Sequence, residues 1–75
     1  MRYDNDAAKR WFQLGTNKGA THLLVVLDTT DFEYYPMYVL PGQDLESEKQ
    51  AYAKLHNIQP YRTFDLSRDV EDQLQ

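Results

Sequence analysis

The chain has 75 residues, enough for one small domain, and a core of that size rarely supplies more than about 3–5 kcal/mol of stability. It contains no cysteine, which excludes disulfides and thiolate metal sites. Its net charge of −4 disfavours ordinary contact with nucleic-acid phosphates. No apolar run reaches the length of a membrane span or of a signal peptide core, so a cytoplasmic protein is expected.

Charge is distributed unevenly along the chain. Residues 1–19 carry four basic and two acidic side chains, whereas residues 20–75 carry four basic and ten acidic ones. An acidic body is compatible with binding a basic protein surface. Net charge of this size is also ordinary for a domain that has only to stay soluble.

A first helix is expected to have Asn5 or Asp6 as its N-cap. Apolar residues then recur at helical spacing and form one stripe. Gly15 weakens this helix by about 1 kcal/mol relative to alanine, and the helix is expected to end between Gly15 and Gly19, with Gly19 as a left-handed cap. The stripe consists of Ala7, Ala8, Trp11, Phe12 and Leu14, of which Trp11, Phe12 and Leu14 are interpreted as core rather than interface.

Two strands and a turn are expected between Gly19 and Gly42. The first strand, about Thr21 to Thr29, is apolar throughout residues 23–27, which is typical of a central strand covered on both faces. The second strand, about Phe32 to Leu40, contains Pro36. Because proline cannot donate to a ladder, this strand is expected to lie at an edge or to carry a bulge.

The remaining elements follow in the order helix, strand, helix. A second helix is expected over about Leu45 to His56, capped by Asp44. A third strand is expected over about Pro60 to Leu66, and Ser67 is expected to cap a short acidic helix over Arg68 to Leu74. In the third strand, alternation places Arg62, Phe64 and Leu66 on one side and Tyr61, Thr63 and Asp65 on the other.

The chain order α-β-β-α-β-α predicts a single α+β domain over residues 1–75, with a three-stranded antiparallel sheet in the order 2-1-3 and helices packed on it. The two longer helices are expected on the same face of the sheet. The other face is also apolar, so either the C-terminal helix or another molecule must cover it. This predicts a protein partner or a second copy of the chain.

Tyrosines gather on the second and third strands. Tyrosines on an edge strand pack across the sheet or form a protein interface. Together with Arg62 they can also form a stacking platform for single-stranded nucleic acid, but the acidic neighbours Asp31, Glu33 and Asp65 disfavour direct nucleic-acid binding. The predicted interface residues are Tyr34, Tyr35, Met37, Tyr38 and Tyr61.

Carboxylates around the hairpin turn are the strongest catalytic candidate. Asp28, Asp31 and Glu33 can hold Mg²⁺ through oxygen ligands, and a bound metal can activate water, so a small metal-dependent hydrolase is an alternative. The same residue types are common at turns, where they bond the local backbone, and no EF-hand spacing is present. The preferred interpretation has no metal, no cofactor and no catalytic residue.

Two further sets of polar residues have functional as well as structural interpretations. His22 and His56 lie on different elements without metal-ligand spacing, and Ser67 is interpreted as a helix-start residue rather than a nucleophile. Acidic residues near the C-terminus can imitate DNA phosphates, which makes a DNA mimic a second alternative, although a solvated helix surface is the commoner meaning. The acidic-face candidates are Asp65, Asp69, Glu71 and Asp72, with Glu46 and Glu48 beside them.

Several short motifs resemble small uncharacterised proteins encoded by bacteriophages and by bacterial genomes that carry prophages. These motifs are Gly-Ala-Thr-His at 19–22, Asp-Thr-x-Asp at 28–31, Tyr-Pro at 35–36 and Pro-Gly at 41–42. The resemblance implies a genetic context, in which small acidic proteins often act by binding a host protein, and it implies no mechanism. We therefore expect a non-catalytic protein-binding module, an accessory or inhibitor protein.

Overall fold

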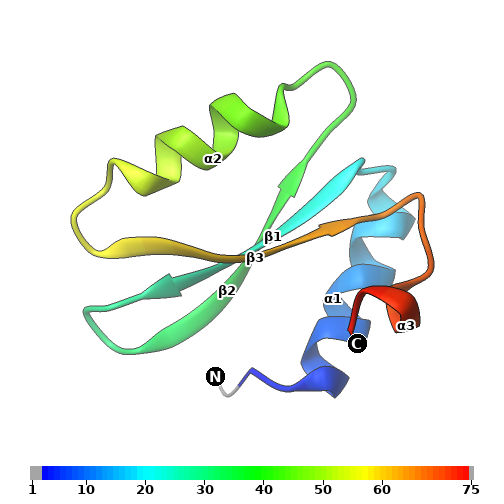
Figure 1. The fold of residues 1–75 in the computed structure, drawn as a ribbon, viewed down its shortest axis with the longest axis horizontal. Coiled ribbons are helices and arrows are strands. Elements are labelled where there is room, and N and C mark those ends of the chain that lie inside the picture. Colours follow the sequence, from blue (N-terminus) through cyan, green and yellow to red (C-terminus); the bar gives the residue numbers. More distant parts are fainter. Residues whose placement is uncertain (1–2, 75) are drawn as a thin grey trace.

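The computed structural model describes residues 3–74, and within them three strands form one antiparallel sheet in the order β2-β1-β3 (Figure 1). The predicted α+β class, chain order and strand order are confirmed. The elements are α1 (Asn5–Lys18), β1 (His22–Asp28), β2 (Glu33–Val39), α2 (Leu45–Ala53), β3 (Ile58–Asp65) and α3 (Val70–Gln73).

β1 occupies the centre of the sheet because its apolar side chains serve both faces. It pairs with β2 from His22 opposite Val39 to Asp28 opposite Glu33, without interruption. Its pairing with β3 shifts once, between Val25 and Val26. The run from Leu23 to Val26 is fully buried, as expected for a strand covered on both sides.

One face of the sheet packs against α1 and α3. Phe12 of α1 meets Phe64 of β3 edge to face, with ring centroids 6.4 Å apart. An exposed ion pair joins α1 to α3, since Lys9 Nζ lies 2.8 Å from a carboxylate oxygen of Glu71. The buried side chains of this layer are Ala7, Ala8, Trp11, Leu23, Val25 and Phe64.

The opposite face packs against α2, so the prediction that both longer helices share one face is wrong. Leu24 and Val26 lie on this side and pack with Leu45 and Tyr52 of α2. Neighbouring residues of a strand point to opposite faces, and each of the two long helices covers one of the two sets. Both faces of β1 are therefore covered within the monomer (Figure 1).

The ends of α1 agree with prediction only in part. Gly19 has φ +76° and closes the helix in the left-handed conformation, as predicted. The N-cap is Asp4 rather than Asn5 or Asp6, since the Asp4 carboxylate accepts a hydrogen bond from the Ala7 N–H at 2.8 Å. Asp4, Asn5 and Asp6 can each cap a helix, and the packing of the apolar stripe of α1 determines which of them does so. No helix in residues 3–74 is long and apolar enough to cross a membrane.

The two later helices are shorter than predicted. Asp44 caps α2 as expected, but α2 ends at Ala53 rather than near His56. The cap of α3 is Asp69, whose carboxylate accepts from the Glu71 N–H at 2.8 Å. Ser67, the predicted cap, donates its hydroxyl to Asp65 instead, at 2.7 Å.

A bulge in β3 changes the side on which Tyr61 lies. The ring of Tyr61 lies 5.1 Å from that of Tyr34 and 5.6 Å from that of Tyr3, and both partners belong to the α1 side of the sheet. The predicted placement of Tyr61 opposite Arg62 and Phe64 is therefore wrong. An extra residue in one strand breaks the alternation, and the register shift at Val25/Val26 is where this happens.

Gly15 allows α1 to approach the sheet closely. A Cβ atom at Gly15 would lie 2.7 Å from Cε1 of Tyr38 and 2.8 Å from Cδ1 of Leu66. The Tyr38 ring is held in place because its hydroxyl donates to the Trp11 carbonyl at 2.7 Å. The glycine that weakens the helix by propensity is thus needed for packing.

Gly15→Ala is expected to lower the melting temperature, although alanine favours a helix by about 1 kcal/mol. Crowding a well-packed site costs about 1–3 kcal/mol, and the Tyr38 ring cannot turn away without losing its hydrogen bond. Thermal unfolding of the variant, compared with Asn17→Ala at an exposed position of the same helix, measures the difference. A Gly15→Ala protein more stable than the native chain would contradict the packing role.

Candidate functional site

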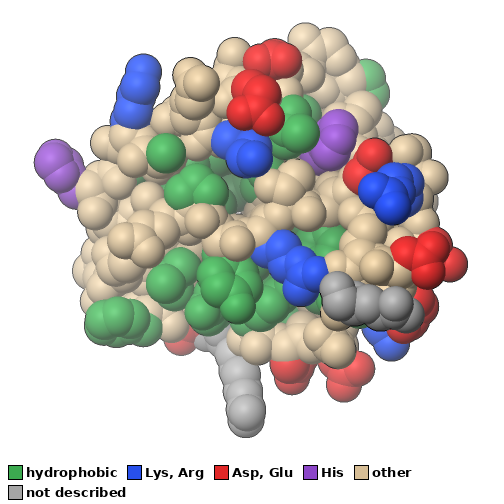
Figure 2. All heavy atoms as spheres, viewed as in Figure 1, with side chains coloured by type: hydrophobic (Ala, Val, Ile, Leu, Met, Phe, Trp, Pro, Cys, Tyr) green, Lys and Arg blue, Asp and Glu red, His purple; other side chains and the backbone are tan. Residues whose placement is uncertain are grey.

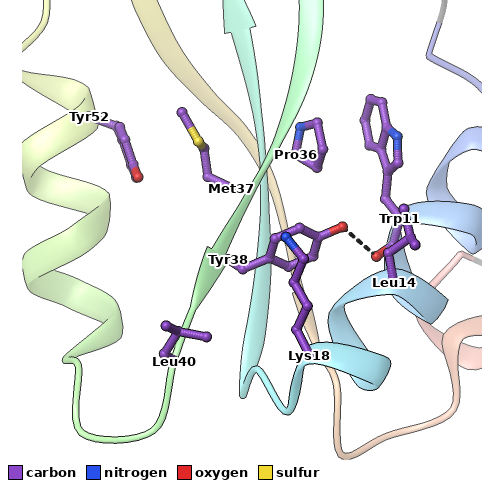
Figure 3. Close-up of a pocket in the computed structure, with 8 residues that line it drawn as sticks. All are labelled: Trp11, Leu14, Lys18, Pro36, Met37, Tyr38, Leu40 and Tyr52. Carbon is purple, nitrogen blue, oxygen red and sulfur yellow. Dashed lines mark hydrogen bonds between the residues drawn. The ribbon is translucent and has the colours of Figure 1, made fainter.

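A groove of about 530 Å³ follows the open edge of β2 between α1 and α2 (Figure 3). Its lining includes consecutive residues of β2, whose side chains point to opposite faces, so the hollow straddles the edge of the sheet. We call it the edge groove. It is lined by Trp11, Leu14 and Lys18 of α1, by Pro36, Met37 and Tyr38 of β2, and by Leu40 and Tyr52.

The edge groove is apolar and carries one charge. Leu14 and Leu40 are 46% and 44% exposed, so both offer apolar surface to the solvent. Leu14 was predicted to be core, and its exposure corrects that prediction. Among the lining residues only Lys18 is charged, and its Nζ lies 4.8 Å from the ring centroid of Tyr38, within the range of a cation–π contact.

Tyr38 ties the edge groove to α1. Its hydroxyl donates to the Trp11 carbonyl at 2.7 Å (Figure 3), which fixes the angle between β2 and the helix. A phenol with an ordinary pKa of about 10 is already protonated at neutral pH, and burial raises the pKa of Tyr38 further, so its hydroxyl can donate. The wall of the groove formed by α1 is therefore preorganised.

The backbone edge of β2 is interrupted at Pro36. The Leu66 N–H donates to the Thr21 carbonyl across the β1–β3 pair. Because the backbone N–H and C=O groups of successive residues in an antiparallel strand point to alternate neighbours, those of odd-numbered β1 residues point toward β3 and those of even-numbered ones toward β2. Pro36 lies opposite Val25, which places its nitrogen on the open side. The predicted edge strand is confirmed, and its edge lacks a donor at the middle position.

The structure does not bring the five predicted interface residues to one surface. Met37 and Tyr38 line the edge groove. Tyr34 and Tyr61 pack edge to face, with an interplanar angle of 69°, and therefore do not form a flat stacking platform. The Tyr35 hydroxyl donates to Asp31 at 3.1 Å, and this hydrogen bond raises the pKa of Tyr35.

An aromatic cluster formed by Tyr3, Trp11, Tyr34 and Tyr61 lies on the α1 side of the sheet. Tyr3 is at its centre, with ring centroids 5.3 Å from Tyr34 and 5.9 Å from Trp11. Burial raises the pKa of Tyr3, and the nearby positive charge of Arg62 partly opposes this. Mutual packing of the rings, rather than a free binding face, accounts for this cluster.

The turn carboxylates serve the hairpin itself. Asp28 accepts from the Thr30 N–H at 2.9 Å, and Asp31 accepts from the Glu33 N–H at 3.0 Å. These are local Asx-type bonds that hold the turn. Within residues 3–74 no three acidic or histidine side chains converge as metal ligands, so the structure gives the alternative metal site no geometric support.

A second hollow of about 410 Å³ lies at the other end of β1, lined by Ala20, Thr21, His22, Asp65, Leu66 and Ser67. The Ser67 hydroxyl donates to Asp65, and His22 Nδ1 lies 3.1 Å from the Thr21 hydroxyl. No spacing along the sequence reveals this grouping, since only the pairing of His22 with Asp65 across the sheet creates it. The serine is directed at a carboxylate rather than at an imidazole base, so it is not arranged as a nucleophile.

Most of the predicted acidic face is engaged in local contacts. Asp65 accepts from Ser67, Asp69 caps α3, and Glu71 pairs with Lys9 of α1. Asp72 lies in the first turn of α3, where a carboxylate suits the helix dipole. These roles in the fold are sufficient to explain why the residues are acidic.

Comparison with known proteins yields no relative: no protein-family model matches the chain, and neither a curated protein nor a solved structure shows significant similarity to it. The resemblance to phage-encoded proteins therefore stays a prediction.

Ser67→Ala is expected to raise the pKa of Asp65, because the Ser67 hydroxyl is the main cause that holds it below 3.8. A carboxyl whose pKa is lower in the folded chain adds stability above its unfolded pKa and loses it as the pH falls through the folded pKa. The variant should thus be less stable than the native chain near neutral pH, and this difference should shrink in strong acid. Carboxyl chemical shifts and melting temperatures across pH measure both effects, with Ser47→Ala as control; an unchanged Asp65 pKa would contradict the assignment.

Excess Mg²⁺ or Mn²⁺ is expected to leave the melting temperature unchanged, because the turn carboxylates already accept local hydrogen bonds and do not converge. An ion that bound the folded chain would raise the melting temperature by mass action. Thermal unfolding with and without each ion provides the measurement. A rise that disappears in Asp28→Ala and in Asp31→Ala would restore the metal-dependent hydrolase.

Proposed function

We propose that this protein is a non-catalytic binding module that holds a segment of another protein in the edge groove. The observation that carries the proposal is the apolar surface of Leu14 and Leu40, exposed beside the half-buried Met37 and Tyr52. The phage-type resemblance supports a host protein as the partner and a cytoplasmic role as accessory or inhibitor.

The composition of the edge groove supports protein binding. Tyrosine and methionine are enriched in the centres of protein interfaces, and the partly exposed Met37, Tyr38 and Tyr52 line the groove, whereas Trp11 at its base is buried. Its volume is in the range of sites that bind small ligands, about 300–1,000 Å³. Hydrophobic side chains also gather over the hairpin end of the sheet (Figure 2), which is not the half of β2 that lines the groove.

The proposal depends on the edge of the sheet and not on its faces. The sequence suggested a partner because one face of β1 seemed to need cover, but Leu23 to Val26 are buried within the monomer. The open surface lies instead along β2, where α1 and α2 stand on either side (Figure 3). A binding role therefore has a different physical basis from the one that the sequence provided.

The lining of the groove determines which kind of partner segment fits it. Pro36 removes a backbone donor from the middle of the edge, so pairing through main-chain hydrogen bonds is weakened. Side chains must supply most of the contact. A segment with one large apolar side chain and a nearby carboxylate fits best, since the apolar lining includes Lys18 as its single charge.

The two alternatives have weaker support. A metal-dependent hydrolase requires Asp28, Asp31 and Glu33 to converge, and the first two instead hold the turn. A DNA mimic requires an array of free carboxylates, whereas Glu71 is paired with Lys9. Melting with Mg²⁺ or Mn²⁺ tests the first alternative, and the capture experiment below tests the second.

Leu14→Glu and Leu40→Glu are each expected to weaken capture of a host protein by about tenfold or more, because a carboxylate in an apolar contact must lose its hydration, and 1.4 kcal/mol already corresponds to tenfold. Leu55→Glu provides a matched control, since Leu55 is 50% exposed but lies outside the groove. Tagged native and variant proteins would be compared by quantitative capture from bacterial lysate.

Loss of the same captured protein in both groove variants, with retention in Leu55→Glu, supports the proposal. Equal capture by all of the variants contradicts it. Capture that survives in the groove variants but is lost on charge reversal of Asp69 and Glu71 would favour the DNA mimic instead.

A further inference from the structure

Phe32 at the tip of the β1–β2 hairpin is both strained and exposed. Its φ is +56°, a left-handed conformation that is unfavourable for a residue with a bulky side chain. It is also 76% exposed, the most exposed large hydrophobic side chain among the described residues. Neither the turn nor the core uses this ring, so its place at the tip calls for a contact outside the monomer.

The position of Phe32 along β2 matches the position of the edge groove. Phe32 and Leu40 lie equally far along the chain from Pro36, at the middle of the strand. If two copies align their β2 edges about a two-fold axis through Pro36, Phe32 of one copy lies opposite Leu40 of the partner subunit. The groove occupies that half of β2, so each copy brings its ring to the other's groove.

The charges agree with this arrangement. Asp31 and Glu33 flank Phe32 in the sequence, whereas Lys18 lies over Tyr38, two residues before Leu40. The same two-fold axis brings the acidic tip of one hairpin to the basic wall of the other groove. Complementary charge of this kind fixes the register of a contact and speeds its formation.

We infer that a second copy of this chain occupies the edge groove, with Phe32 of each subunit inserted into the groove of the other. The inference rests on the proposed function, because it takes the groove to be a binding site, and it makes the dimer the resting state from which another protein must displace Phe32. Such a contact is isologous and closes on itself. Pro36 at the axis has no backbone N–H to donate, so side-chain contacts hold the dimer. Such a dimer is reversible.

Light scattering and sedimentation over a range of concentrations test the inference with the native chain, Phe32→Asn and Leu55→Asn. Asparagine tolerates the left-handed conformation, so Phe32→Asn is expected to keep or raise the melting temperature at concentrations where both proteins are monomeric. It is expected to raise the dimer dissociation constant by about tenfold or more. Leu55→Asn should dimerise as the native chain does. Lys18→Glu should weaken the dimer as well.

A mixture of two variants gives a sharper test. Phe32→Asn keeps an intact groove, and Leu14→Glu keeps an intact ring, so the mixture restores one of the two contacts and should form heterodimers more tightly than either variant forms homodimers. A native chain that stays monomeric at all concentrations, or a dimer that Phe32→Asn does not weaken, would overturn the inference. Because Phe32→Asn leaves the groove unchanged, capture of a host protein by this variant is judged separately: retention supports the proposed function even where the dimer fails.

Discussion

The burial of β1 on both faces is the constraint on which the rest of the structure depends. Leu23 and Val25 point to one side and Leu24 and Val26 to the other, so a chain of 75 residues must divide its helices between two layers. α1 and α3 cover one layer and α2 the other (Figure 1). Covering both faces leaves no element to cover the outer edge of β2 in the described chain, and an apolar groove opens along that edge.

The close approach of α1 turns this open edge into a groove. Without a side chain at Gly15, the helix comes near enough for the Tyr38 ring to pack against it and to donate to the Trp11 carbonyl. The following turn of α1 then carries Lys18 over the outer face of the same ring. One glycine, chosen against helix propensity, thus determines both the packing of the core and the shape of the candidate site.

The order of the helices and strands could be predicted from the sequence, but the face of the sheet on which each helix and side chain lies could not. A continuous apolar run marked the central strand, Pro36 marked the edge, and Asp44 and Gly19 marked helix ends, because each of these signals is local. The face chosen by α2 depends on the path of its connections, and the side of Tyr61 depends on a bulge in pairing with Val25. The groove draws residues from α1, β2 and α2, so no spacing along the chain could reveal it.

Open sheet edges invite uncontrolled pairing between chains, and this domain limits that risk in two ways. Pro36 interrupts the donors of the β2 edge, and the acidic residues Asp31 and Glu33 flank the hairpin tip, both of which discourage extended ladders. The same features leave side-chain contact available, since neither removes the apolar lining at Leu14 or Leu40. An edge that resists main-chain pairing but retains an apolar groove favours a contact of defined register, which is the property that a binding module needs and that an aggregating strand lacks.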